Sequence, residues 1–141
     1  MPIIRKQRKI PLKVEDVMSA PPITATEDTP VSDIAKMMYD NKVGSVIIVD
    51  SQGKVIGIVT ERDITHACAM GVMGKETKAF AIMTENPITV SPYDSIEEAF
   101  KKMKTANIRH LPVVDKGGKP VGALSMRDVT DALFSFLLVL F

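Results

Sequence analysis

The sequence has a single cysteine, Cys68, and only two histidines among its 141 residues. One cysteine excludes an internal disulfide framework and suits a reducing compartment. A structural zinc site needs four ligands, so the neighbouring pair His66 and Cys68 is too small to form one. Nothing marks Cys68 as an activated nucleophile, and no other catalytic set is present. The sequence therefore predicts a protein that is not an enzyme and that holds no metal or resident cofactor.

Long apolar runs and an excess of one charge are also missing. The apolar stretch at 136–141 is far shorter than the roughly 20 residues that span a bilayer. The N-terminus lacks the apolar run of a secretory signal peptide, so no leader is expected. The formal net charge of +1 at pH 7 gives no bulk attraction to nucleic acid or to an anionic membrane. These absences predict a cytoplasmic protein without membrane contact.

The most informative feature that is present is a repeat with a spacing of 65 residues and no gap. Its matched pairs include Met18/Met83, Gly57/Gly122, Arg62/Arg127 and Asp63/Asp128. A repeat this faithful predicts two copies of one unit that pack against each other. Neither copy, at about 60 residues, buries enough surface to be stable alone, so we expect a shared core.

Each copy predicts a strand, a helix, a two-stranded hairpin and a second helix, which makes the fold class α+β. Thr29 and Pro30 predict the start of the first helix, and Asp94, with Glu97 three residues on, predicts the start of its equivalent. Apolar runs at 46–49 and 55–59, and again at 111–114 and 121–124, predict the hairpins. The expected architecture is two βαββα units packed about a pseudo-twofold axis as one module.

The chain is expected to divide into a basic N-terminal arm (1–13), repeat 1 (14–70), a linker (71–78) and repeat 2 with an apolar C-terminal helix (79–141). The arm carries Arg5, Lys6, Arg8, Lys9 and Lys13. Such an arm is either a solvated tail or a nucleic-acid contact. The apolar C-terminal segment is expected to pack into the core or against a partner subunit.

A hydroxyl three residues before an aspartate follows each hairpin, as Thr60 and Asp63 and again as Ser125 and Asp128. One helical turn apart at a helix start, the two groups lie on the same face. The structural interpretation is an N-cap and an acid that offsets the helix dipole. The functional interpretation is recognition of phosphate by the free N–H groups and of a ribose diol by the carboxylate. Recurrence at the same spacing favours the second interpretation.

The motifs as a whole resemble a tandem pair of CBS domains, the cystathionine β-synthase type regulatory module. The resemblance covers residues 14–135, and its segments are 16–18, 22–24, 44–50 and 57–64 in the first copy and 82–83, 87–89, 108–115 and 122–129 in the second. Members of this family bind AMP, ADP, ATP or S-adenosylmethionine in two clefts between the copies. The resemblance therefore implies a regulatory module that senses an adenosine-containing ligand.

The resemblance also implies which residues share each cleft. One cleft is expected to contain Thr60, Arg62, Asp63, Ile88, Thr89, Arg109, His110 and Pro112. The other is expected to contain Ile23, Thr24, Gly44, Ser45, Val46, Ser125, Arg127 and Asp128. Arg109 and His110 resemble a phosphate-gripping pair of kinase-regulating members, and two cationic donors make strong bonds to phosphate. The cleft with Asp63 is therefore expected to prefer phosphorylated nucleotides, and the uncharged pair Gly44 and Ser45 to leave the other weaker.

The predicted function is a stand-alone sensor that acts as a homodimer and changes the activity of an unidentified effector protein. Two other functions stay open. The chain could be a structural dimerisation adaptor with unused clefts, or a nucleic-acid-associated regulator that uses its basic arm.

Overall fold

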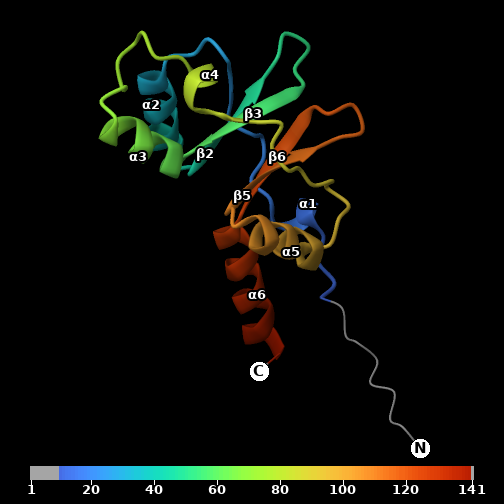
Figure 1. Cartoon of the computed structure of the whole chain (residues 1–141). Helices are drawn as coiled ribbons and strands as arrows, with labels where there is room; N and C mark the ends of the chain where they lie inside the picture. Colours follow the sequence, from blue (N-terminus) through green and yellow to red (C-terminus); the bar gives the residue numbers. More distant parts are fainter. Residues whose placement is uncertain (1–9, 141) are drawn as a thin grey trace, which may run out of the picture.

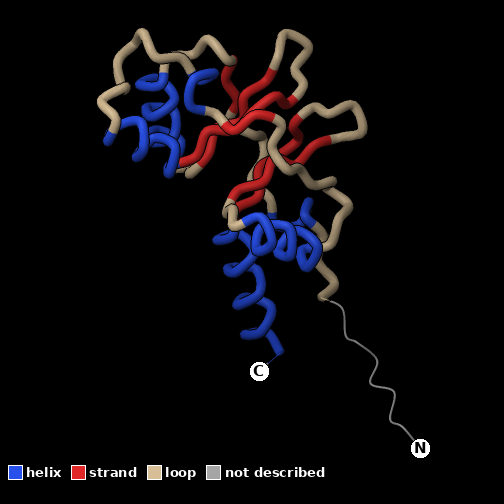
Figure 2. The backbone as a smooth tube through the Cα atoms, viewed as in Figure 1, coloured by secondary structure: helices blue, strands red, loops and turns tan. Residues whose placement is uncertain are grey.

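The computed structural model describes residues 10–140 and arranges them as two similar halves (Figures 1 and 2). The first half contains β1 (Thr24–Thr26), α2 (Val31–Asn41), β2 (Ser45–Val49), β3 (Val55–Thr60), α3 (Glu61–Ala69), α4 (Ala79–Ile82) and β4 (Thr84–Glu85). The second half contains α1 (Val14–Val17), α5 (Ile96–Ala106), β5 (His110–Val114), β6 (Pro120–Ser125) and α6 (Met126–Leu140). Cationic residues 5, 6, 8 and 9 of the expected arm lie outside the described residues.

Each half is built on a hairpin with the same neighbours. In the first half the strand order is β1-β2-β3-β4, with β1 parallel to β2 and the other pairs antiparallel. In the second half β5 and β6 form the antiparallel hairpin. Two isolated bridges replace the outer strands there. The parallel bridge from Val90 to Val113 corresponds to β1, and the antiparallel bridge from Ser19 to Ala123 corresponds to β4. The predicted hairpins and the α+β class with two repeats are confirmed.

The two repeats exchange their N-terminal segments. Helix α1 comes from the first repeat and contacts β6 and α6 of the second half, whereas α4 comes from the second repeat and contacts α2, α3 and β3 of the first. The exchange is fixed by backbone hydrogen bonds, such as Ser19 N–H to Ala123 O at 2.9 Å and Ala123 N–H to Ser19 O at 3.0 Å. Residues 19–23 therefore cross from one half to the other.

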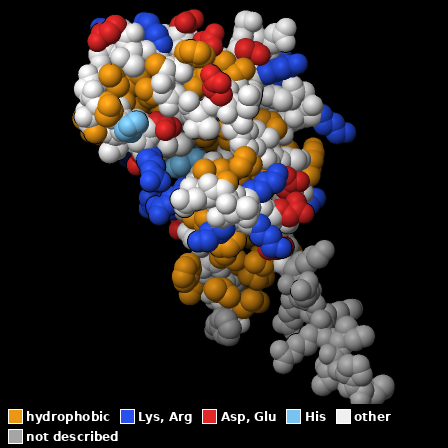
Figure 3. Space-filling model, viewed as in Figure 1, with side chains coloured by type: hydrophobic (Ala, Val, Ile, Leu, Met, Phe, Trp, Pro, Cys, Tyr) orange, Lys and Arg blue, Asp and Glu red, His pale blue; other side chains and the backbone are white. Residues whose placement is uncertain are grey.

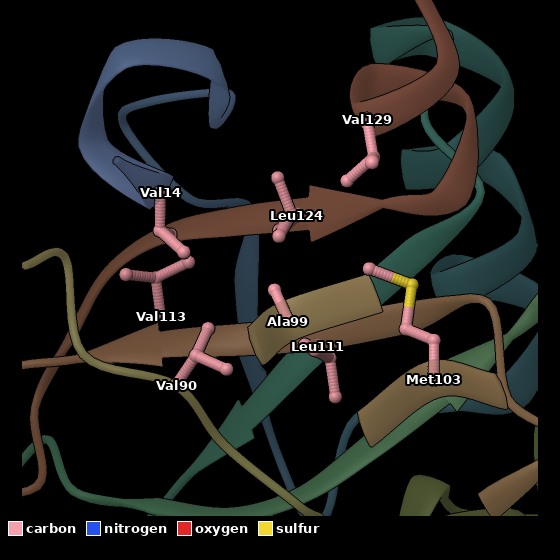
Figure 4. Packing of buried hydrophobic residues seen from close by; sticks show 8 residues of the cluster. All are labelled: Val14, Val90, Ala99, Met103, Leu111, Val113, Leu124 and Val129. Atoms are coloured by element: carbon pink, nitrogen blue, oxygen red, sulfur yellow. The ribbon is translucent and has the colours of Figure 1, made fainter. Parts of the chain in front are cut away.

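The exchanged segments complete two equivalent cores. The first contains Ile34, Met38, Val46, Ile48 and Val59 with Ala79 of the second repeat. The second, shown in Figure 4, contains Val90, Ala99, Met103, Leu111, Val113, Leu124 and Val129 with Val14 of the first repeat. Six positions of one core match six of the other at the 65-residue spacing. Because each core needs a side chain from the other repeat, neither repeat closes its core alone.

The start of α5 differs from the sequence prediction by one residue. Ser95 is the N-cap, because its hydroxyl accepts a hydrogen bond from Glu98 N–H at 3.2 Å. The carboxylate of Asp94 instead accepts from Ser91 N–H at 2.9 Å and closes the preceding turn. Glu97 Oε1 is buried without a hydrogen-bond partner among the described residues, so the expected capping box is not formed.

The start of α2 also differs, because Pro30 takes the N-cap position and no side chain caps the helix. The Thr29 hydroxyl accepts from Thr26 N–H at 3.2 Å and stabilises the turn that leads into the helix. In the second copy, the expected first strand reduces to the single bridge between Val90 and Val113. None of the helices within residues 10–140 combines the length and the apolar character needed to traverse a bilayer.

Candidate functional site

The hydroxyl and carboxylate at the start of α3 contact each other. Asp63 Oδ2 accepts from Thr60 N–H at 2.8 Å and from the Thr60 hydroxyl at 3.2 Å. Both groups are partly buried where β3 ends and α3 begins. The aspartate therefore has a structural function at the helix start, as the structural interpretation of the motif expects.

The equivalent pair at the start of α6 forms a reciprocal arrangement. Asp128 Oδ2 accepts from Ser125 N–H at 2.8 Å, and Ser125 Oγ accepts from Asp128 N–H at 3.0 Å. Within the described residues, the hydrogen bonds to Asp63 and Asp128 reach only the Oδ2 atom of each. The cap therefore fixes the carboxylate in place and leaves Oδ1 to accept hydrogen bonds from a ligand's hydroxyl groups.

The first residue of each hairpin lies beside the hydroxyl residue of the same hairpin. Ser45 pairs with Thr60 across β2 and β3, and His110 pairs with Ser125 across β5 and β6. The preceding residue is held as well, because Arg109 O accepts from the first N–H of α6 at 2.8 Å. Arg109 and His110 are therefore fixed next to the start of α6, at the positions that Gly44 and Ser45 hold next to α3.

A groove of about 1590 Å³ lies between the two halves. Its lining includes three groups of residues: Ser19, Pro21, Pro22 and Ile23 from the crossing segment, Gly44, Ser45, Arg109 and His110 from the strand starts, and Ser125, Arg127 and Asp128 at the start of α6. Residues of α2, α3 and α5 also line it, together with Lys42 just after α2. Figure 3 shows lysine and arginine side chains beside the notch between the halves. The groove combines an apolar segment, a helix start and charged side chains of both signs.

His110 is the half-buried titratable group of this groove, and its side chain reaches across to the first half. A Cβ placed on Gly44 would lie 2.8 Å from His110 Cε1 and would also collide with the Glu61 carboxylate. Burial lowers the pKa of His110 below its usual 6.5, an effect that Glu61 and Asp128 oppose and Arg109 reinforces. Glycine at position 44 is therefore needed for the imidazole of one repeat to approach the other repeat.

The groove brings together only part of the expected site. It contains Ile23, Gly44, Ser45, Ser125, Arg127 and Asp128 of one expected cleft, together with Arg109 and His110 of the other. The residues that do not line it are Thr24, Val46, Thr60, Arg62, Asp63, Ile88, Thr89 and Pro112. Val46 is fully buried in the core of the first half. Thr89 lines a separate pocket of about 310 Å³, and its carbonyl accepts from Lys102 Nζ at 3.0 Å.

The expected grouping of Arg109 and His110 with Thr60 and Asp63 stays a prediction, and the groove offers a second arrangement. The groove that these two residues line contains Ser125 and Asp128 and neither Thr60 nor Asp63. The physical reason is the register of the second hairpin, which pairs His110 directly with Ser125. Arg109 and His110 therefore line the same groove as Asp128.

Sequence reasoning missed the lining residues Ser19, Pro21 and Pro22. The two prolines indicate only that the chain is not helical there. The available signal is the paired recurrence of Met18/Met83 with Gly57/Gly122, because each methionine contacts the glycine of the other repeat. The recurrence of methionine and glycine in both repeats therefore hints at a close backbone contact. The sequence does not show that each methionine meets the glycine of the other repeat.

The described part of the chain has no group of three or more histidine, cysteine, aspartate or glutamate side chains that could hold a metal ion. Cys68 is exposed and not in a disulfide.

A model of the CBS domain matches the chain twice, over residues 14–69 and 79–135. Among solved structures, the CBS domain pair of protein MJ0100 in complex with 5′-methylthioadenosine and S-adenosyl-L-methionine is 31% identical, with a TM-score of 0.82 over 88% of this chain and 97% of that one. A CBS domain protein from Pyrobaculum aerophilum complexed with AMP is 32% identical, with a TM-score of 0.77 over 83% of this chain and 89% of that one.

Curated relatives include the uncharacterized protein MJ1404 of Methanocaldococcus jannaschii, which is 40% identical over 108 residues, or 77% of this chain and 26% of that protein. A homoserine O-acetyltransferase of Methanosalsum zhilinae is 33% identical over 118 residues, or 84% of this chain and 23% of that protein. This chain therefore spans about a quarter of the length of these two relatives.

Proposed function

The chain belongs to the CBS-domain family, and from this premise we propose that it is a regulatory module that binds an adenosine-containing ligand in the groove beside Asp128. Occupation of the groove then changes the activity of an effector, and the module acts as a homodimer.

The observation that carries the proposal is the composition of the groove. The start of α6 presents a favourable dipole to an anion, and the Ser125 hydroxyl can donate a hydrogen bond while its oxygen accepts from Asp128 N–H. Asp128 Oδ1 can accept from the two hydroxyls of a ribose. Pro22 and Ile23 supply an apolar wall for a base. These are the three kinds of contact that a nucleoside with an anionic group requires.

Two of the similar structures support the ligand class. One contains 5′-methylthioadenosine and S-adenosyl-L-methionine, and the other contains AMP. All three ligands contain adenosine, but they differ in charge. The choice among them in this chain depends on its own residues.

Arg109 and His110 favour a ligand with phosphate in this groove. The family resemblance assigns this pair to the cleft with Asp63 and therefore predicts the phosphate preference there. Because both residues line the groove with Asp128, we now expect phosphate-bearing ligands to bind here.

The crossing segment connects the two halves and lines the groove, so a ligand that contacts it can affect both halves. Residues 19–23 bond to β6 at Ser19 and lead into β1 at Thr24, and four of them line the groove. A ligand that contacts this segment and α6 together binds the two halves in one relative position. Regulation follows if the ligand binds that position more tightly than the alternatives.

The test is a thermal-unfolding and calorimetric titration with AMP, ADP, ATP, S-adenosylmethionine, 5′-methylthioadenosine and NAD. A ligand at 100 times its dissociation constant adds about 2.7 kcal/mol of stability, which is several degrees in melting temperature. We expect Asp128→Ala to weaken binding about 10- to 150-fold through loss of a hydrogen-bonded charge.

Asp63→Ala is the matched control. Both aspartates accept a backbone N–H through Oδ2 at 2.8 Å, so each variant loses the same helix-start contact, worth about 1 kcal/mol. Of the two aspartates, only Asp128 lines the groove, so only Asp128→Ala should weaken ligand binding. No stabilisation by any ligand would overturn the proposal. Equal weakening by both variants would show that the cleft with Asp63 also binds.

A further inference from the structure

The two strand starts that line the groove occupy equivalent positions of the two repeats but carry different side chains. At the 65-residue spacing Gly44 matches Arg109, and the residue that follows is uncharged in the first repeat and is His110 in the second. The backbone is the same in both places, because Glu61 N–H donates to Gly44 O at 3.1 Å and Met126 N–H donates to Arg109 O at 2.8 Å. Ionisable side chains therefore occupy the strand start of one half and the helix start of the other.

These altered side chains come together beside Gly44. A Cβ placed on Gly44 would collide with the carboxylate of Glu61, from α3, and would lie 2.8 Å from Cε1 and 3.2 Å from Nε2 of His110, from β5. Both side chains line the groove. They form no ion pair within residues 10–140, so Glu61 acts on the imidazole through its charge and not through a hydrogen bond. An acid of the first half and an imidazole of the second thus share one place at the junction of the halves.

The protonation of His110 depends on its burial and on three charged neighbours. Burial has the largest effect and lowers the pKa of His110 below its usual 6.5, because it penalises the charged form. Glu61 and Asp128 oppose this effect, and Arg109 reinforces it. At pH 7.5 the imidazole of the ligand-free protein is therefore neutral. The other charged residues that line the groove are Asp40, Lys42, Lys104, Arg127 and Asp131.

A phosphate group in the groove would change this balance. A phosphate monoester has a second pKa of about 6, so above pH 7 it brings about 1.5 to 2 negative charges. Beside His110 these charges add to those of Glu61 and Asp128 and favour the protonated imidazole, which then makes a charge-assisted hydrogen bond. An adenosine without phosphate offers no such gain, and His110 stays neutral beside it.

We propose that a phosphate-bearing ligand binds this groove together with one proton, which His110 takes up, and that Glu61 is the positioning residue that stabilises the charged imidazole from the opposite half. The inference rests on the proposed function and adds the proton to it. Of the two acids that act on His110, only Glu61 belongs to the first half, so the attraction between the halves forms when the proton binds. A ligand without phosphate occupies the groove and leaves this attraction absent.

The first experiment is isothermal titration calorimetry of the full chain with AMP at pH 7.5, in buffers that differ in ionisation enthalpy. We expect close to one proton to be taken up for each AMP bound. The affinity should then rise by up to about tenfold per pH unit as the pH is lowered from 8.5 to 7. The phosphate of AMP changes its own protonation little in this range. For 5′-methylthioadenosine we expect no proton uptake and a flat pH profile.

Two variants assign the proton and the group that stabilises it. His110→Gln keeps a polar side chain that does not titrate, so it should abolish the proton uptake and the pH dependence for AMP. Glu61→Gln should weaken AMP about two- to fivefold at pH 7.5, as expected for an exposed charge, and should have no such effect in the His110→Gln background. Glu98→Gln is the matched control, because Glu98 is an exposed glutamate in the first turn of α5 that does not line the groove.

The outcomes separate this inference from the proposed function. A wild type that binds none of the adenosine-containing ligands overturns both. Binding of S-adenosylmethionine or 5′-methylthioadenosine without binding of AMP keeps the proposed function and overturns the inference. AMP binding without proton uptake, or with an uptake that persists in His110→Gln, also overturns it. If Glu61→Gln behaves like the Glu98→Gln control, or tightens AMP in both backgrounds, Glu61 is not the positioning residue.

Discussion

Met18 lies over Gly122, with its sulfur 2.5 Å from the position that a Cβ on that glycine would occupy. Sixty-five residues on, the sulfur of Met83 lies at the same distance from the corresponding position on Gly57. Each methionine belongs to the segment that crosses into the other half. The repeated glycines therefore leave room for the crossing backbone. Near Gly122 this backbone is also close, because Ser19 O lies 3.0 Å from the Cβ position on that glycine.

We expect Gly122→Ala to destabilise the protein by about 1–3 kcal/mol, because the added methyl group overlaps Met18 and the crossing backbone. Urea unfolding monitored by circular dichroism measures the change. Gly117→Ala is the control, because its Cβ would meet its nearest neighbour, Asp115 Oδ1, at an ordinary 3.4 Å. A cost for Gly122→Ala no larger than for Gly117→Ala would contradict this account of the crossing.

Ser95→Ala is expected to reduce the free energy of unfolding by about 1 kcal/mol, since the hydroxyl accepts from Glu98 N–H at the start of α5. Ser95→Asp keeps an acceptor at the N-cap and should restore most of the loss. Urea unfolding monitored by circular dichroism measures the free energy of unfolding of both variants. If the aspartate variant is as unstable as the alanine variant, the capping contact is not the cause.

The regular elements of this fold follow from short-range patterns in the sequence. The run Val46–Val49 predicts a buried strand, and Val46, Ile47 and Ile48 are at most 1% exposed. The helix starts were less predictable, because Thr29 and Asp94 bond to preceding turns instead of capping. Asp, Ser and Thr are suited to both functions, and the choice depends on backbone geometry several residues away.

The site could be predicted in kind but not in arrangement. The recurrence of Ser125 and Asp128 at the spacing of Thr60 and Asp63 indicates two equivalent helix starts. Which strand start and crossing segment meet each helix is a non-local property, and for this reason the sequence alone does not show that His110 lines a groove with Asp128. The short helices α1 and α4, of four residues each, have no periodicity to detect.

The stability of the protein should fall as the pH is lowered through about 6.5, in part because of His110. Burial lowers the pKa of His110 in the folded state, so below its usual pKa the unfolded chain takes up a proton that the folded chain resists. Above that pH both states are neutral at this side chain and the effect vanishes. His110→Gln should therefore lose less stability than the wild type between pH 7.5 and pH 5.5, as measured by urea unfolding. Parallel losses in the two proteins would show that His110 does not contribute.

Arg109→Ala should discriminate between ligands that differ in phosphate. Arg109 lines the groove and its backbone is held by α6, so its guanidinium is placed to make charge-assisted bonds to phosphate oxygens. We expect the variant to bind AMP about 10- to 150-fold more weakly and to bind 5′-methylthioadenosine, which has no phosphate, as the wild type does.

Arg62→Ala is the control for this prediction, because Arg62 is an exposed arginine on α3 that does not line the groove. Isothermal titration calorimetry of both ligands with the three proteins gives the comparison. Equal weakening of AMP and 5′-methylthioadenosine by Arg109→Ala would indicate a distorted groove, which a shifted unfolding midpoint would reveal. Unchanged AMP affinity would place the phosphate elsewhere and favour the cleft with Asp63.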